Sequence, residues 1–383
     1  MSTDLPAILK FAKTQQASDV HICPEMPPLL RLHGKIVKLD VAPLSRDVAQ
    51  NAIFGLMSAE QRKAFDATHD IDFALEIPEV ARFRANVFLQ RRGVQAAFRL
   101  IPAKVKSLDE LGMPPVLKQL AQKERGLVLV TGTTGSGKST TLAAMIDYIN
   151  ETESGHILTI EDPIEFVHEP KRCLVSQREV GANTESFASA LRAALREDPD
   201  VILVGELRDL ETTHLAITAA ETGHLVFGTL HTNSAAKTID RIVDIFPTGQ
   251  QAQIRTVLSE SIEGIIAQTL LPSKDGKGRV PALEVLVGVP ALRNLIREDK
   301  TAQIPSVIQT GAQHGMISLD QSLRDLVMQG KLAREVAMKK SSNPRGFEGP
   351  AAGAGAGGEA AAAPARPGQA RPEAAPRQGA VAR

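Results

Sequence analysis

The chain has 383 residues, of which 43% are hydrophobic and 23% are charged, a composition typical of a soluble globular protein with two or three domains. Lys+Arg and Asp+Glu both number 44, so the formal net charge is +0, and a chain-wide basic field for gripping nucleic acid or an anionic membrane is excluded. Aromatic residues make up only 3%, which weighs against a surface that binds single strands by base stacking.

Residues 1–100 predict a small α+β domain. An amphipathic helix is expected over Leu5–Gln16, and one or two helices over Val48–Phe65. The segment Ala81–Leu89 alternates apolar and polar residues with the period of a half-buried strand, and Val94–Leu100 follows a short turn as its hairpin partner. Further strands are expected at Leu29–Leu32, Ile36–Leu39 and Ile71–Glu76.

A proline-containing connector with one short helix is expected over residues 101–124. Residues 125–340 are expected to form the core domain, in which strands alternate with helices from residue 125 as far as Pro247. Alternating strands and helices predict a parallel sheet covered by helices on both faces, so the fold class is α/β. Strands are expected at Gly126–Thr131, His156–Ile160, Val201–Val204 and Leu225–Leu230, and helices at Ser139–Glu151, Phe187–Arg196 and Thr212–Glu221. Beyond Pro247 the pattern predicts mostly helices, broken by a polar, hairpin-like stretch at Ser273–Arg279.

The last segment, residues 341–383, is rich in Ala, Pro and Gly. We expect all of residues 341–383 to be a disordered tail, because from Pro350 onward the segment has too few apolar residues to offset the entropy of ordering.

The two cysteines, Cys23 and Cys173, lie far apart and form no CxxC pair, so a four-cysteine zinc site is excluded. The N-terminus lacks the basic start and apolar run of a secretory signal, and no stretch approaches the ~18 apolar residues that span a bilayer. We therefore expect a cytoplasmic protein with no transmembrane segment.

A glycine-rich turn between the first core strand and the next helix matches the pattern GxxxxGK[ST]. Its glycines let backbone N–H groups surround phosphates at the positive end of a helix. Lys138 is expected to reach the β- and γ-phosphates of ATP, and the Ser139 hydroxyl to bind Mg²⁺. The predicted nucleotide-binding residues are Gly132, Thr133, Thr134, Gly135, Ser136, Gly137, Lys138, Ser139 and Thr140.

Carboxylates follow two of the predicted core strands, at the sheet edge where ligands of open α/β sheets bind. Val201–Val204 leads into Gly205 and Glu206, and Glu206 is expected to polarise the attacking water. Glu161 and Glu165 follow the strand at His156–Ile160. These two acids either position Mg²⁺ or water, or cap the next segment.

Two histidines, His224 and His231, bracket the strand Leu225–Leu230. Their spacing is not that of two metal ligands on one helix. An imidazole near the γ-phosphate would sense hydrolysis, although a histidine taken alone is more often structural.

Four segments together resemble the type II/IV secretion ATPase superfamily. The phosphate loop, Thr159–Glu165, Asp198–Arg208 and Gly223–Thr232 occur in the order of its Walker A, Asp box, Walker B and His box. The segment Ala291–Glu298 is similar to the AIRNLIRE element of PilT-type pilus retraction ATPases, with Leu292 in place of Ile. The similarity runs from residue 1 to about 340.

This resemblance implies an N-terminal PAS-like domain joined to a RecA-like ATPase core with C-terminal helices, assembled as a homohexamer. It implies that Glu206 is the catalytic glutamate and that Glu161, Glu165, His224 and His231 support the γ-phosphate and the water. Family members also supply arginines from the N-terminal domain to the nucleotide. The matching candidates are Arg82, Arg84 and Arg99, although exposed strand arginines are usually only solvated.

The implied function is ATP hydrolysis that drives type IV pilus disassembly, retraction and twitching motility, at the inner face of the inner membrane. The implied partners are the pilus platform protein in that membrane and a paralogous retraction ATPase. The alternatives are an accessory PilU-type retraction ATPase, a pilus assembly ATPase of the same superfamily, a DNA-translocating RecA-like motor, and a non-catalytic ring. Assembly ATPases usually carry paired-cysteine zinc motifs, so the two distant cysteines argue against assembly. Zero net charge argues against the DNA motor, and the complete phosphate loop argues against the non-catalytic ring.

Overall fold

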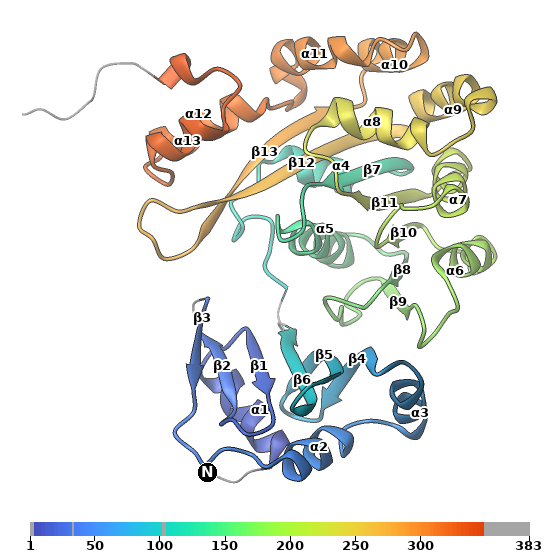
Figure 1. Ribbon diagram of the computed structural model, residues 1–383. Coiled ribbons are helices and arrows are strands. Elements are labelled where there is room, and N and C mark those ends of the chain that lie inside the picture. The colour runs from blue at the N-terminus through green and yellow to red at the C-terminus, as the bar shows by residue number, and fades with distance from the viewer. Residues whose placement is uncertain (1–3, 33, 102–104, 348–383) are drawn as a thin grey trace, which may run out of the picture.

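The computed structural model describes residues 4–32, 34–101 and 105–347, and its strands form two sheets (Figure 1). The N-terminal sheet is antiparallel, with the strand order β3-β2-β1-β6-β5-β4. Its strands are β1 (Asp19–Ile22), β2 (Leu29–Leu32), β3 (Lys35–Lys38), β4 (Asp70–Ile77), β5 (Ala81–Gln90) and β6 (Gly93–Ile101). The predicted hairpin of β5 and β6 is confirmed, whereas β1 and its place beside β6 were not predicted.

Three helices accompany this sheet: α1 (Leu5–Thr14), α2 (Arg46–Phe54) and α3 (Ala59–Thr68). Phe83, Ala85 and Val87 of β5 are buried and belong to one core with apolar residues of α1 and α2. Since side chains alternate along a strand, Arg82 and Arg84 lie on the opposite face of the sheet. The charged side chains on this opposite face can therefore contact other parts of the molecule, as Arg82 does with Glu179.

The second sheet has the order β13-β12-β7-β11-β10-β8-β9 and is parallel except for β13 at its edge. Its central strands are β7 (Gly126–Thr131), β8 (His156–Glu161), β10 (Val201–Val204) and β11 (Leu225–Leu230), as predicted. The edge strand β9 (Leu174–Glu179) was not predicted.

Helices cover both faces of this sheet, which confirms the α/β class. Val128 and Val130 of β7 pack with α4 (Val116–Ala121) and α5 (Lys138–Thr152). The alternate residues Leu127 and Leu129 pack with the helices on the other face. Those helices include α6 (Phe187–Ala194), α7 (Leu210–Glu221), α8 (Ala235–Asp244) and α9 (Thr248–Ser261).

The expectation of mostly helical structure beyond Pro247 is wrong for residues 262–287. These residues form a long antiparallel hairpin, β12 (Ile262–Pro272) and β13 (Arg279–Val287), and the polar stretch at Ser273–Arg279 lies at its turn. β12 also pairs in parallel with β7, so the hairpin is part of the core sheet. The run of apolar residues in β12 is buried on both faces and lacks the alternation that marks a half-buried strand.

The C-terminal region is helical, with α10 (Pro290–Arg297), α11 (Ile304–Thr310), α12 (Leu319–Met328) and α13 (Arg334–Lys340). Residues of α12 and α13 form a small core with Leu271 and Ala282 of the hairpin. This core also contains Phe347, and Ser342 donates to Asp320, so the predicted disordered tail begins too early at residue 341. The rest of that predicted tail, residues 348–383, lies outside the described residues, as do residues 102–104 of the predicted connector. None of the helices in the described ranges has the length and hydrophobicity to span a membrane.

Candidate active site

The glycine-rich turn connects the carboxyl end of β7 to the first residue of α5, as its pattern predicts. Gly132 and Gly137 have φ values of 145° and 89°, in the region that favours glycine. A Cβ atom at Gly132 would lie 2.3 Å from the carbonyl oxygen of Gln268, and one at Gly137 would lie 2.7 Å from Nε2 of Gln268. These two glycines are therefore required by both backbone conformation and space.

Gln268 of β12 holds this turn from the side, a role that the sequence did not reveal. Its Nε2 donates to the carbonyl oxygen of Ser136 at 2.7 Å, and its Oε1 accepts from Thr141 Oγ1 at 2.8 Å. The side chain is buried, so both hydrogen bonds are shielded from water. The hairpin thus fixes the shape of the phosphate loop.

Lys138 lies over the loop that precedes it. Its Nζ donates to the carbonyl oxygen of Gly132 at 2.9 Å. Partial burial lowers the pKa of Lys138, and the nearby Glu206 carboxylate opposes this shift. The ammonium group is therefore held at the phosphate-binding end of the sheet.

A cavity of about 710 Å³ opens at this end and gathers most of the predicted site residues. From the loop and α5 it is lined by Thr134, Gly135, Gly137, Lys138, Ser139 and Thr140. Gly132, Thr133 and Ser136 do not line it, and the Ser136 side chain is buried within the loop. Arg279, at the start of β13, also lines the cavity and donates through Nη1 to the Gly135 carbonyl oxygen at 3.3 Å. No sequence signal identified Arg279.

Glu206 lies at the carboxyl end of β10 and lines the cavity. Its Oε1 lies 3.0 Å from Nε2 of His231, which follows β11, the neighbouring strand. Arg208 contacts the same oxygen, a contact that was not predicted. Two cavity-lining partners therefore orient the Glu206 carboxylate.

Glu161 ends β8 and is buried beside the same cavity. Burial raises the pKa of Glu161 to about 7, although hydrogen bonds from Thr159, the backbone of Glu165 and Gln177 act in the opposite direction. The bond from Thr159 Oγ1 is 2.9 Å long. Glu165 lines the cavity as well, so both predicted acids are present.

Among the described residues that line this cavity, the oxygen-bearing side chains are of the type that Mg²⁺ prefers. They include the hydroxyl of Ser139 and the carboxylates of Glu161, Glu165 and Glu206. In the part of the chain that the structure describes, no three His, Cys, Asp or Glu side chains lie close enough together to hold a metal ion by themselves. The Ser139 hydroxyl therefore fits a magnesium ion whose other ligands are mainly phosphate oxygens and water.

The structure does not bring His224 to this cavity. His224 directly precedes β11, whereas His231 directly follows it, so the two histidines lie at opposite edges of the sheet, roughly 20 Å apart. The His224 ring interacts with the carbonyl oxygen of Ala219 at 3.0 Å. The predicted support of the γ-phosphate by His224 is therefore not met within this subunit.

Two of the three predicted arginines face the cavity. Arg84 of β5 and Arg99 of β6 are direct cross-strand neighbours and both line it. Two like charges side by side are unfavourable without a counter-charge, and Asp72 and Asp19 each pair with one of them. Arg82 does not line the cavity but forms an ion pair with Glu179 of β9.

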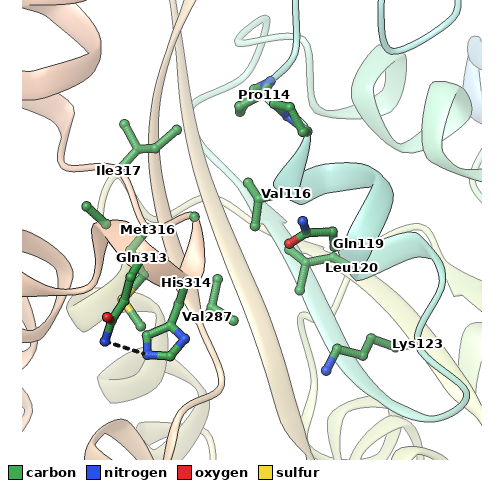
Figure 2. A pocket seen from close by; sticks show the side chains of 13 residues that line it. Pro114, Val116, Gln119, Leu120, Lys123, Val287, Gln313, His314, Met316 and Ile317 are labelled. Atoms are coloured by element: carbon green, nitrogen blue, oxygen red, sulfur yellow. Dashed lines mark hydrogen bonds between the residues drawn. The ribbon is translucent and has the colours of Figure 1, made fainter.

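A second cavity, of about 680 Å³, lies between α4 and the segment before α12 (Figure 2). Its lining is mainly apolar, with Val116, Leu120 and Met316 among the side chains in Figure 2. Lys123 lines it too, but its Nζ is paired with Glu263 at 3.0 Å. The charged groups suited to phosphate chemistry belong to the first cavity.

A family model described as type II/IV secretion system protein matches residues 2–342. A protein of Pseudomonas aeruginosa named "Type IV pilus retractation ATPase PilT" is 56% identical over 344 residues, which cover 90% of this chain and 100% of that protein. A second protein of Pseudomonas aeruginosa, named "Type IV pilus ATPase PilU", is 40% identical over 86% of this chain and 87% of its own length.

Among solved structures, that of the pilus retraction motor PilT with bound ADP matches with a TM-score of 0.84 and 50% identity. The match covers 90% of this chain and 98% of the other.

Proposed function

This chain belongs to the type II/IV secretion system protein family, and from that membership we propose that it is an ATPase motor that drives disassembly and retraction of a type IV pilus. The observation that supports this best is the convergence of Lys138, Glu206 and His231 on one cavity, in a chain so similar to a pilus retraction ATPase. ADP bound to a related retraction motor supports the same nucleotide chemistry here.

The cavity residues have the roles that phosphoryl transfer requires, namely positioning and neutralisation of charge. Lys138 and the loop N–H groups bind the phosphates, and Ser139 is the hydroxyl that would hold Mg²⁺. Bound there, the ion supplies neutralisation of charge on the phosphate oxygens. Glu206 orients and polarises the attacking water, and His231 fixes the Glu206 carboxylate in place. Arg84 and Arg99 add positive charge from the N-terminal sheet.

The arginines and the phosphate loop belong to different sheets, so nucleotide binding favours approach of the two sheets and loss of the γ-phosphate favours their separation. Residues 101–124 would be the hinge of this movement. We take residues 1–100 as a PAS-like domain and residues 125–340 as a RecA-like core. A homohexamer of such subunits would turn the movement into rotation of the pilus platform protein, from the cytoplasmic face of the inner membrane.

An accessory PilU-type role is the second candidate, and the greater identity to PilT argues against it. A DNA-translocating motor is less well supported because the net charge is +0. A PilU-type paralogue would be a partner of the ring.

The proposal is tested in two steps. The purified protein should hydrolyse ATP with Mg²⁺, and Lys138→Ala should abolish this activity. Deletion of the gene should then leave cells with excess, immobile pili that the wild-type gene corrects and the Lys138→Ala gene does not. Bald cells would instead indicate a role in pilus assembly, and unchanged ATPase activity of Lys138→Ala would exclude the assigned site.

A further inference from the structure

Glu179 is a buried carboxylate at the end of the edge strand β9 and does not line the nucleotide cavity. Its Oε2 accepts a hydrogen bond from Nη2 of Arg82 at 3.0 Å. The same oxygen accepts from the backbone N–H of Ile164 at 3.1 Å. Arg82 belongs to the N-terminal sheet and Ile164 to the core, so one oxygen atom contacts both parts of the molecule.

The segment that contains Ile164 forms one wall of the nucleotide cavity. It follows Glu161, and Asp162, Pro163 and Glu165 line the cavity. The segment is held by two neighbouring carboxylates, because Glu161 Oε2 accepts from the N–H of Glu165 at 3.3 Å. Glu161 and Glu179 are themselves direct partners in the register of β8 and β9.

The ion pair with Arg82 is energetically significant because the side chain of Glu179 is only 9% exposed. A buried carboxylate that loses its cationic partner pays a desolvation cost that a surface pair does not. Separation of the two sheets would therefore leave the Glu179 carboxylate without its cationic partner. The Glu179 side chain would then rotate toward water or toward another hydrogen-bond donor. Either change removes or alters the acceptor of the Ile164 N–H.

Arg82 and Arg84 lie two residues apart on the same face of β5, and only Arg84 lines the cavity. Since a paired strand moves as a unit, docking of Arg82 on Glu179 and approach of Arg84 to the cavity occur together. β5 thus places Arg84 at the nucleotide cavity and Arg82 on Glu179, the residue that holds the wall segment.

We propose that Glu179 is a positioning residue that couples the placement of the N-terminal sheet to the wall segment at residues 162–165, with Arg82 as the contact on the other side. This inference rests on the proposed ATPase function. In the docked arrangement Glu179 holds Ile164, and thereby the segment next to Glu161. In the undocked arrangement the segment is released and hydrolysis slows.

The first test measures hydrogen exchange of the peptide that covers residues 162–168 in the full-length protein, with a non-hydrolysable ATP analogue and magnesium, the state in which the two sheets are docked. The Arg82→Ala substitution lies outside this peptide. We nevertheless expect the protection of the peptide against exchange to fall by about fivefold or more in Arg82→Ala, as it does in Glu179→Ala. Glu197→Gln is the matched control, since it neutralises another 3.0 Å ion pair of β9, with Arg178, and should leave the peptide unchanged. Unchanged protection in Arg82→Ala, with protection lost in Glu179→Ala, would overturn the coupling.

The second test is a double-mutant cycle on kcat at saturating ATP, with Arg82→Ala, Glu179→Gln and the double variant. If the two residues act as a pair, the double variant is no slower than the slower single variant. Effects that multiply would overturn the proposal, because Arg82 and Glu179 would then act independently. A wild-type protein without ATPase activity would instead refute the proposed function, so the two failures are distinguishable. Glu179→Gln keeps a side-chain oxygen that can accept the hydrogen bond from the Ile164 N–H. The variant is therefore expected to fold, so that a slower kcat reports the lost ion pair and not unfolding.

Discussion

His231 and Glu206 join the ends of two neighbouring strands: Nε2 of His231 lies 3.0 Å from Oε1 of Glu206 at the mouth of the phosphate loop. The contact makes the imidazole a direct partner of the carboxylate that we propose to act on water. His224, seven residues earlier in the chain, has no such contact, because the whole of β11 separates it from this edge of the sheet.

Replacing Glu206 by Gln should lower kcat for ATP hydrolysis by about 100-fold or more, since a positioned base contributes that much to proton transfer. The affinity for ADP should be nearly unchanged, because the phosphate loop and Lys138 remain intact. Steady-state kinetics and titration with a fluorescent ADP analogue separate the two effects. Glu211→Gln, which neutralises the acid of an exposed ion pair between α6 and α7, is the matched control. Equal activity of the two variants would contradict the role of Glu206.

The two histidines should differ in their effect. His231→Ala is expected to lower kcat by about tenfold or more, because the Glu206 carboxylate loses an orienting partner. His224→Ala should cause a clearly smaller loss. Kinetics of the purified variants decide this, and a larger loss in His224→Ala would show that a neighbouring subunit or another conformation uses that ring.

Gln268→Leu should weaken ATP binding and destabilise the fold. The variant leaves the Ser136 carbonyl oxygen and the Thr141 hydroxyl without their buried partner, at a cost of about 1–3 kcal/mol each. Thermal unfolding with and without ADP measures both consequences. Gln251→Leu removes one hydrogen bond, donated by the Gln251 side-chain amide to the Phe246 carbonyl oxygen, and should affect binding little. Equal ADP affinity in both variants would remove Gln268 from the binding site.

Glu161 should impart a pH dependence to stability. Burial raises the pKa of Glu161 from 4.5 to about 7, so the folded chain keeps this proton to a higher pH than the unfolded chain does. Between these two pKa values the folded state binds more protons, and a rise in pH therefore lowers the free energy of unfolding. The contribution is fully present below about pH 4.5 and lost above about pH 7.

In Glu161→Gln this contribution is absent. As the pH rises from 5 to 8, the free energy of unfolding of the wild type should therefore fall relative to that of Glu161→Gln, by up to about 3 kcal/mol. Urea unfolding at the two pH values measures the shift. A difference that stays constant would mean that Glu161 titrates normally in the folded protein.

Most of the core sheet was predictable because its strands are short apolar runs followed by ligand-binding turns. The strand before Gly132 and the strand before Glu206 are examples, and their partners in the sheet follow from the alternation of strands and helices. β12 was missed because a strand buried on both faces lacks a period of two and cannot be told from a buried helix by pattern alone. Gln268 and Arg279 were missed with it, since their importance depends on the pairing of β12 with β7.

The distance of His224 from the cavity within one subunit has a different explanation. The family pattern groups both histidines, but a residue that precedes a parallel strand lies at the opposite edge from one that follows it. That signal was present in the sequence. The pairing of Arg82 with Glu179 was not, because these two residues are 97 positions apart in the chain and their contact depends on how the two sheets face each other.

The hairpin of β12 and β13 has a mechanical consequence. Gln268 grips the phosphate loop, and only three residues further along the same strand Leu271 packs against the terminal helices, roughly 10 Å away. A pull on α12 or α13 would thus reach the loop through one stiff strand, without a flexible linker in its path. A mechanical load on the terminal helices would therefore change the affinity of the phosphate loop for the nucleotide. The rate of ATP turnover of such a motor would then depend on the tension applied to it.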